Sequence, residues 1–244
     1  MAIAVVQAVS TTGIASTALT LSGLTTTSGN LYAAAIVMGG ANPVSSVTDS
    51  ASNAWIKQAG NAVNHGVEIW TTTAASPSAI TTVTANVGSS TLILFEFYEI
   101  SGALSNTLPV DVSATNNDTI TAASTTATRT PAYFADLAIG VVGWELINNA
   151  TADSGATFTD GVGTNNFIDF HSGVTDLHIS TSTLVLTGGT KTAQTFTTTL
   201  SNTPTAGYGA TIVLLKGLGS TGIDSGNYRN LKVGTGMGRS DVAS

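Results

Sequence analysis

The chain has 244 residues and a formal net charge of −7, and only 9% of its residues are charged, against about 25% in an ordinary soluble domain. Its seven basic residues are too few for a surface that binds nucleic acid or an anionic membrane, because both need clustered Lys and Arg. The length suits one large all-β domain or two small domains, and no run approaches the ~20 apolar residues of a membrane helix.

Short apolar and alternating segments predict strands along most of the chain, with Gly, Asn and Ser between them. No segment shows a sustained helical period with capping residues, so we expect little helix. The pattern predicts an all-β fold: a two-layer antiparallel β-sandwich of jelly-roll type with about a dozen strands. The predicted strands are residues 31–38, 44–48, 54–58, 67–73, 79–86, 92–100, 108–114, 133–145, 167–171, 177–180, 183–186, 195–200 and 210–216.

The sandwich domain is expected over 1–218. Within it LYAAAIVMGG resembles DLAIGVVGWE, and LILFEFYEISG resembles ATIVLLKGLG. Either the chain holds two similar halves, 1–115 and 116–218, or buried strands look alike for compositional reasons. Residues 219–244 are rich in Gly and Ser and are expected to form an extended C-terminal tail.

Two compositional features disagree about the compartment. The N-terminal MAIAVVQAVSTTG lacks the positively charged segment of a secretory signal, and the chain has no cysteine that would indicate an oxidising environment. A β protein rich in Thr and Gly and poor in charge is nevertheless typical of proteins outside cells. Assembly into a virus particle in the host cytoplasm, followed by lysis, reconciles the two; an exported chain without its signal is the alternative.

The order of segments adds a resemblance. NLYAAAIVMGG, PVSSVTDSASNAWIKQAG, VEIWTTTAASPSAITTVTANV and LFEFYEISGA follow one another, and DLAIGVVG, SGATFTDG and ATIVLLKG continue the series. From residue 16 to 217 the chain resembles a β-sandwich domain that recurs in tailed-phage structural proteins and bacterial surface proteins. The resemblance implies a virion-surface or adhesive module, without catalysis and without a cofactor.

Two glutamates interrupt the apolar run 92–102. In a strand Glu96 and Glu99 point to opposite faces, so they cannot flank one glycosidic bond as the paired carboxylates of a glycosidase do. We interpret both as structural acids bonded to backbone or to a basic residue. A small glycan hydrolase is therefore disfavoured, and no local signature of a catalytic triad, phosphate loop or dinucleotide site is present.

Two further segments have ligand-like composition. Asp49–Asn53 (DSASN) begins like a calcium loop but lacks its later ligands, and we interpret it as a hairpin connection. Asp169 and His171 precede Asp176 and His178; a turn at Gly173-Val174 would place the two Asp–His pairs opposite each other. Hydrogen-bonded pairs on a solvated face are expected there, and a zinc site is the alternative.

Contacts with other molecules are expected at two places. Trp55, after the DSASN turn, is the tryptophan expected at the surface, where it could stack on a sugar ring. The tail combines apolar and basic residues, which suits clamping onto a neighbouring acidic body. Its expected contact residues are Tyr228, Arg229, Leu231, Lys232, Val233, Met237 and Arg239.

The sequence thus predicts a non-enzymatic virion structural protein, most specifically a decoration or cement protein on a phage capsid. Its partners would be the major capsid protein or neighbouring subunits, and it would form a homo-oligomer. Uncharged strand edges favour such coverage, because charges are what normally protect edges. The alternative is a receptor- or glycan-binding module of a phage tail, a fibre or a bacterial surface adhesin.

Overall fold

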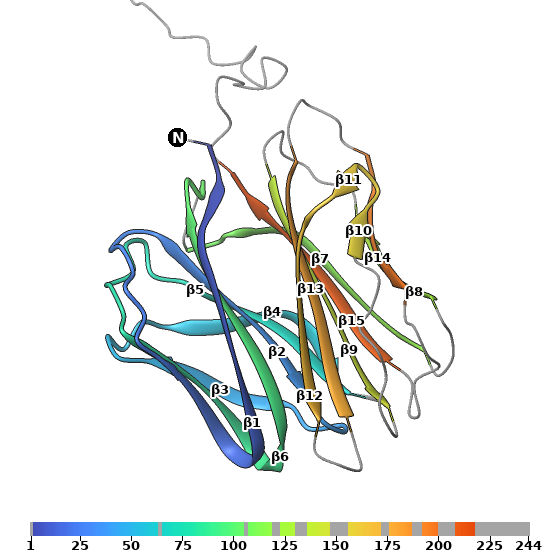
Figure 1. The fold of residues 1–244 in the computed structure, drawn as a ribbon. Helices are drawn as coiled ribbons and strands as arrows, with labels where there is room; N and C mark the ends of the chain where they lie inside the picture. Colours follow the sequence, from blue (N-terminus) through green and yellow to red (C-terminus); the bar gives the residue numbers. More distant parts are fainter. Residues whose placement is uncertain are drawn as a thin grey trace, which may run out of the picture.

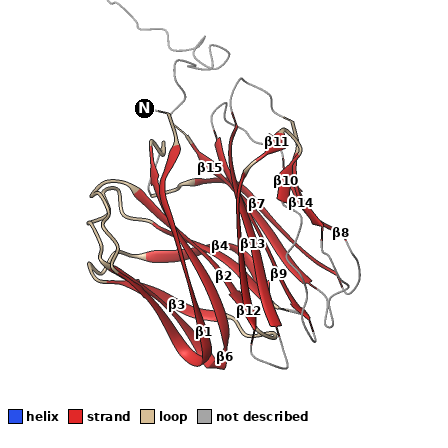
Figure 2. Ribbon diagram, viewed as in Figure 1, coloured by secondary structure: helices blue, strands red, loops and turns tan. Residues whose placement is uncertain are grey.

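A computed structural model describes residues 2–62, 65–104, 107–118, 123–129, 136–146, 156–171, 176–186, 192–199 and 208–217. All regular structure in these residues is β-strand (Figure 2), so the predicted all-β class is confirmed. No helix in this part of the chain could cross a lipid bilayer. The predicted tail, 219–244, lies outside the described residues.

Fifteen strands are described, against the dozen expected. They are β1 (Ala4–Ser22), β2 (Leu31–Met38), β3 (Val44–Asp49), β4 (Trp55–Ala62), β5 (Gly66–Thr72), β6 (Thr82–Ser101), β7 (Val110–Asp118), β8 (Ala123–Arg129), β9 (Asp136–Leu146), β10 (Ala156–Phe158), β11 (Gly161–Val162), β12 (Thr164–His171), β13 (Asp176–Leu186), β14 (Gln194–Thr199) and β15 (Tyr208–Lys216).

Two large antiparallel sheets lie face to face (Figure 1). The first has the strand order β1-β6-β2-β5-β4, with β3 beside β6, and the second has the order β12-β13-β9-β15-β7. Alternate side chains of the facing strands form a common core, to which β2 contributes Ala33 and Val37 and β9 contributes Ile139 and Val141. This arrangement confirms the antiparallel sandwich.

Each large sheet carries a further layer on its outer face. In the first half, β3 and the adjoining ends of β1 and β6 cover a second core that contains Phe95 and Phe97. In the second half, a small sheet of order β11-β10-β14-β8 contributes Phe158 and Phe196 to a third core. The molecule therefore has more layers than the two predicted.

The boundaries of several strands differ from the prediction. The Gly88-Ser89-Ser90 segment reads as a turn, but these exposed residues lie within β6, which runs unbroken from the large sheet into the outer layer. Strand β13 is likewise one element where two were predicted. No strand was predicted over β1, because its polar and apolar residues do not alternate regularly, which gives a weak signal.

The two halves of the chain share one strand topology. Taken in chain order, β1, β2, β4, β5 and β6 of the first large sheet correspond to β7, β9, β12, β13 and β15 of the second, and both sheets have the same spatial order. The outer layers correspond too. In the first half β1 and β6 each run through both the large sheet and the outer layer. In the second half each is replaced by two strands: β7 lies in the large sheet and β8 in the outer layer, and β14 lies in the outer layer and β15 in the large sheet. This agreement favours duplication over compositional coincidence.

The correspondence moves the boundary between the halves. Strand β7 pairs with β15 in the second sheet, so the predicted division at residue 115 falls inside a strand of the second half. The division lies between Ser101 and Val110. The two segment pairs that looked alike in the sequence belong to matching strands, β2 with β9 and β6 with β15.

Glycines let the two large sheets approach closely. A Cβ atom on Gly143 of β9 would lie 2.4 Å from a methyl group of Val37, and one on Gly209 of β15 would lie 2.7 Å from a methyl group of Val67. Val37 and Gly143 occupy matching positions of the two halves, because Leu31 and Leu137 begin the matching pairings with β6 and β15. At this contact the halves meet through equivalent residues.

Candidate functional site

Three glutamates lie inside the first half: Glu68 on β5 and Glu96 and Glu99 on β6, each at most 1% exposed. Carboxyl groups are seldom buried without partners. Their surroundings therefore decide whether they are chemical or structural groups.

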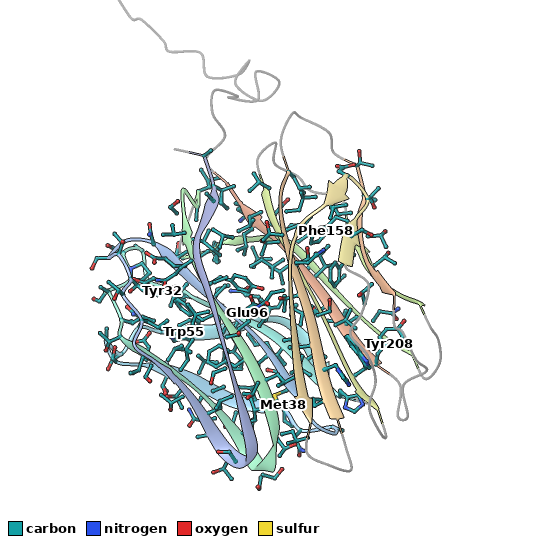
Figure 3. All side chains as sticks on the ribbon, in the orientation of Figure 1. Tyr32, Met38, Trp55, Glu96, Phe158 and Tyr208 are labelled. Atoms are coloured by element: carbon teal, nitrogen blue, oxygen red, sulfur yellow. The ribbon has the colours of Figure 1, made fainter. Side chains whose placement is uncertain are left out.

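Glu96 lies in the middle of the molecule, between the two large sheets (Figure 3). Its Oε1 accepts a hydrogen bond of 2.9 Å from Asn166 Nδ2 on β12, and its Oε2 accepts one from the hydroxyl of Thr181 on β13. Both donors belong to the second half of the chain. The carboxyl group is thus a polar bridge between the two sheets.

Burial raises the pKa of the Glu96 carboxyl above its ordinary value, and hydrogen bonds from Thr181, Asn166 and Tyr98 offset part of the rise. Burial also raises the pKa of the Tyr98 hydroxyl well above its ordinary value, and the neighbouring Glu96 charge adds to this. Glu96, Tyr98 and Thr181 are each at most 2% exposed. A substrate could reach this cluster only if a sheet moved, so the cluster suits holding the halves together.

Glu99 points to the opposite face of β6, as strand alternation predicts. Its Oε1 accepts from the backbone N–H of Thr27 at 2.8 Å and from Asn30 Nδ2 at 2.7 Å, and its Oε2 accepts from Gln7 Nε2 at 2.7 Å. The carboxyl group fixes the loop between β1 and β2. The expected backbone donor is found for Glu99, whereas Glu96 accepts from neutral polar side chains instead of from backbone or a basic residue.

Glu68 holds three elements together. Its Oε1 lies 3.4 Å from Lys57 Nζ and accepts from the backbone N–H of Val44 at 3.3 Å, and its Oε2 accepts from Trp70 Nε1 at 2.7 Å. The pair with Lys57 is the one salt bridge found among the described residues. Strands β3 and β4 are tied to β5 by this side chain.

The Asp49–Asn53 segment is a turn organised by its first residue. Asp49 Oδ1 accepts from the backbone N–H groups of Ala51 and Asn53, and Oδ2 accepts from Asn53 Nδ2 and from Trp55 Nε1, the last at 2.7 Å. Ser52 has a φ of 58°. The predicted hairpin is wrong, because β3 pairs with β6 and β4 pairs with β5.

The expected surface position of Trp55 is also wrong. Trp55 is 9% exposed and belongs to the same buried cluster as Tyr32 and Phe97, and its indole N–H donates to Asp49. Trp144 is buried as well, and Trp70 is half-buried. The three tryptophans thus contribute to the interior of the sandwich.

The Asp–His positions pair in the register expected from the sequence. Asp169 of β12 lies opposite His178 of β13, and His171 lies opposite Asp176, so the backbone places all four on one face. His178 is 1% exposed and its ring stacks on Trp144 with centroids 5.3 Å apart. The predicted solvent-exposed position is therefore wrong for His178.

The zinc alternative is not decided by these contacts. The side chains of Asp169, His171 and Asp176 and the turn at 172–175 lie outside the described parts. Among the side chains that are described, no group of three His, Asp or Glu gathers as a metal site. The expected partner-binding residues between Tyr228 and Arg239 also lie outside the described chain.

Sequence reasoning missed the partners of Glu96. Asn166 and Thr181 are about 70 and 85 residues away along the chain, and no local pattern marks an Asn or Thr as the donor to a distant acid. His65, fully buried, was also missed; burial lowers its pKa to about 4. A histidine beside a glycine turn gives no signal of burial.

Comparison with known proteins gives no match: no family model, no curated protein and no solved structure matches the chain. The resemblance to phage and surface sandwich domains therefore stays a prediction from the sequence.

Proposed function

We propose that this chain is a non-enzymatic structural protein of a virus particle, most specifically a decoration or cement protein on the surface of a phage capsid. The observation that carries the proposal is the use made of the buried acids. Glu68, Glu96 and Glu99 each accept hydrogen bonds from at least two separate elements of the fold, and each is sealed from solvent.

This use of acids suits a protein selected for a rigid body. A glycosidase needs two carboxyl groups on the same side of a cleft, about 5–9 Å apart, whereas Glu96 and Glu99 point into different cores. Lysozyme-like chemistry would also need one acid open to the substrate. The hydrogen bonds of the buried glutamates instead join strands, loops and the two halves of the chain.

The surface supports the role of an assembly subunit. Only 9% of the residues are charged, and the long edge strand β1 has no charge at all; because charges normally keep sheet edges apart, this favours coverage of that edge by a neighbouring subunit or by the capsid shell. The partners proposed are virion proteins, and the assembly would take place in the cytoplasm of the host. The glycan contact expected at Trp55 is not supported, because Trp55 is buried; the receptor- or glycan-binding alternative therefore rests on the sequence resemblance.

Immunogold electron microscopy tests the proposal. Antibodies raised against the recombinant full chain should label the heads of tailed particles released from the cells that encode it, and pre-absorption with the recombinant protein should remove the label. Label confined to tails or fibres would refute the decoration role and favour the receptor-binding alternative. Particles that carry no label on head or tail would refute a virion protein altogether.

A further inference from the structure

Strand β1 forms an unusual edge of the first large sheet. It is 19 residues long, and β6 is its one sheet partner among the described strands (Figure 1). It contains no charged residue and no proline. Exposed backbone N–H and C=O groups on such an edge are a template for pairing with another strand.

The other edge strands differ from β1 in composition. Apart from the two-residue β11, every other edge strand carries a charged residue, and charges on an edge oppose pairing between chains. These residues are Asp49 on β3, Lys57 on β4, Asp111 and Asp118 on β7, Arg129 on β8 and Asp169 on β12. The absence of charge on β1 is therefore a property of this edge and not only of the composition.

The duplicated fold supplies an internal control. Strands β7 and β8 occupy in the second half the place of β1 in the first, and they carry three charges, follow Pro109 and are separated by a connection. Strand β7 also packs against β4, where Ser113 Oγ donates to the backbone carbonyl of Gln58 at 3.2 Å. Among the described residues, one copy of this edge carries charges and packs against β4, and the other is bare, with no charge of its own.

Only part of the β1 edge is regular enough to pair with another strand. Register shifts interrupt β1 between Val5 and Gln7 and again after Gly13, but residues 7–13 pair with β6 without interruption. Within this stretch Ala8, Ser10 and Thr12 are exposed and the residues between them are half-buried. Its centre is Ser10.

We propose that the edge of β1 pairs antiparallel with the same edge of a second copy of this chain, about a two-fold axis at Ser10. This inference rests on the proposed role as an assembly subunit and names the surface that joins two subunits. In this register Ser10 faces Ser10 of the other copy, Ala8 faces Thr12, and Val9 faces Thr11. No charge is brought opposite another, and β-branched pairs on one face favour the pairing.

A second copy fits better than an unrelated strand. A two-fold antiparallel contact is self-complementary and closed, so each copy satisfies the edge of the other with no further component. The molecule already joins two copies of its own fold through the faces of the large sheets. The first large sheets of the two copies would then join edge to edge into one larger sheet.

Sedimentation equilibrium of the full chain is the first test. The expected mass is twice the 24.5 kDa of one chain. Ser10→Lys sets two like charges opposite each other and should raise the dissociation constant of the dimer by about 10-fold or more. The matched control is Thr115→Lys. Thr115 on β7 occupies the position that Ser10 has on β1, because Thr115 lies opposite Thr211 of β15 and Ser10 lies opposite the equivalent residue of β6, Glu96. Thr115→Lys should leave the dissociation constant of the dimer unchanged.

Cysteine cross-linking tests the register, since the chain has no cysteine of its own. Residues that face each other in an antiparallel pair have Cα atoms about 4.5–5.5 Å apart, within reach of a disulfide. Ser10→Cys should therefore form a covalent dimer on mild oxidation. Thr12→Cys should not, because its two copies would lie about 13 Å apart along the strands, and Thr115→Cys should not either.

The outcomes separate this inference from the proposed function. A monomeric full chain, equal effects of Ser10→Lys and Thr115→Lys, or no cross-link with Ser10→Cys would overturn the pairing, whatever the particles show in immunogold labelling. A chain that dimerises only after deletion of residues 218–244 would also overturn it, because the tail would then be the occupant of the edge. A Ser10→Cys dimer with unlabelled particles would keep the pairing and reject the virion role.

Discussion

The bridge between Glu96 and Thr181 gives a quantitative prediction about what joins the two halves. Thr181→Val keeps the shape of the side chain and removes its hydroxyl, so Glu96 Oε2 loses the donor that reaches it from β13. Both residues are 1% exposed, so water cannot replace the bond. Leaving a buried hydrogen-bond acceptor without its donor costs roughly 1–3 kcal/mol, and the expected loss in the free energy of unfolding is about 2 kcal/mol.

Urea denaturation at neutral pH measures this loss. With a slope of roughly 2 kcal/mol per molar urea, the midpoint should fall by about 1 M while the slope stays unchanged. The control is Ser182→Ala on the same strand: Ser182 Oγ is buried and has no hydrogen-bond partner in the described structure. Removing it should leave stability unchanged or raise it by up to about 1 kcal/mol. A Thr181→Val midpoint equal to that of the unaltered protein would refute the bridge.

Three further predictions concern titration and metal. Burial raises the pKa of Glu96 above its ordinary value of 4.5, so its contribution to stability is fully present below pH 4.5 and is lost as the pH rises through the folded-state pKa. Glu96→Gln should therefore flatten the plot of urea midpoint against pH above 4.5. An unchanged slope would count against the raised pKa. Burial lowers the pKa of His65 from 6.5 to about 4, so the free energy of unfolding should fall by roughly 3 kcal/mol as the pH drops across that range; His65→Leu should remove this part of the fall, and an identical pH profile would contradict the burial of an uncharged imidazole. For the Asp169–His178 positions, a chelator should leave the melting temperature unchanged if they form hydrogen-bonded pairs, whereas a drop restored by zinc would establish the metal alternative.

The fold class was accessible from the sequence because period-2 patterning depends on local residues. The central strands β2 and β15 are continuous apolar runs, and their limits were predicted within two residues. Strand β1 was missed because an edge strand buries little on either face, so its residues need not alternate strongly in hydrophobicity. Segment 88–90 was read as a turn because Gly and Ser permit a turn without requiring one.

The chemistry of the interior was less accessible. The opposite orientations of Glu96 and Glu99 follow from strand geometry alone and were predicted. The partners of Glu96 depend on which strands of the second half lie across the sandwich, and this is set by tertiary packing. Those of Glu99 lie on β1 and in the loop between β1 and β2. Trp55 shows the same limit: a polar turn precedes it, but it is buried and its indole N–H donates to Asp49.

On the proposed pairing, the difference between β1 and its counterpart β7–β8 sets how many other copies one chain can join. Had both halves kept a bare edge, each chain could join two neighbours, and such chains would grow into open filaments. With one edge carrying Asp111, Asp118 and Arg129 and the other uncharged, each chain has a single edge suited to the proposed pairing, so pairing between copies would end at a closed pair. A fused duplicate can be asymmetric in this way, whereas two identical separate copies could not.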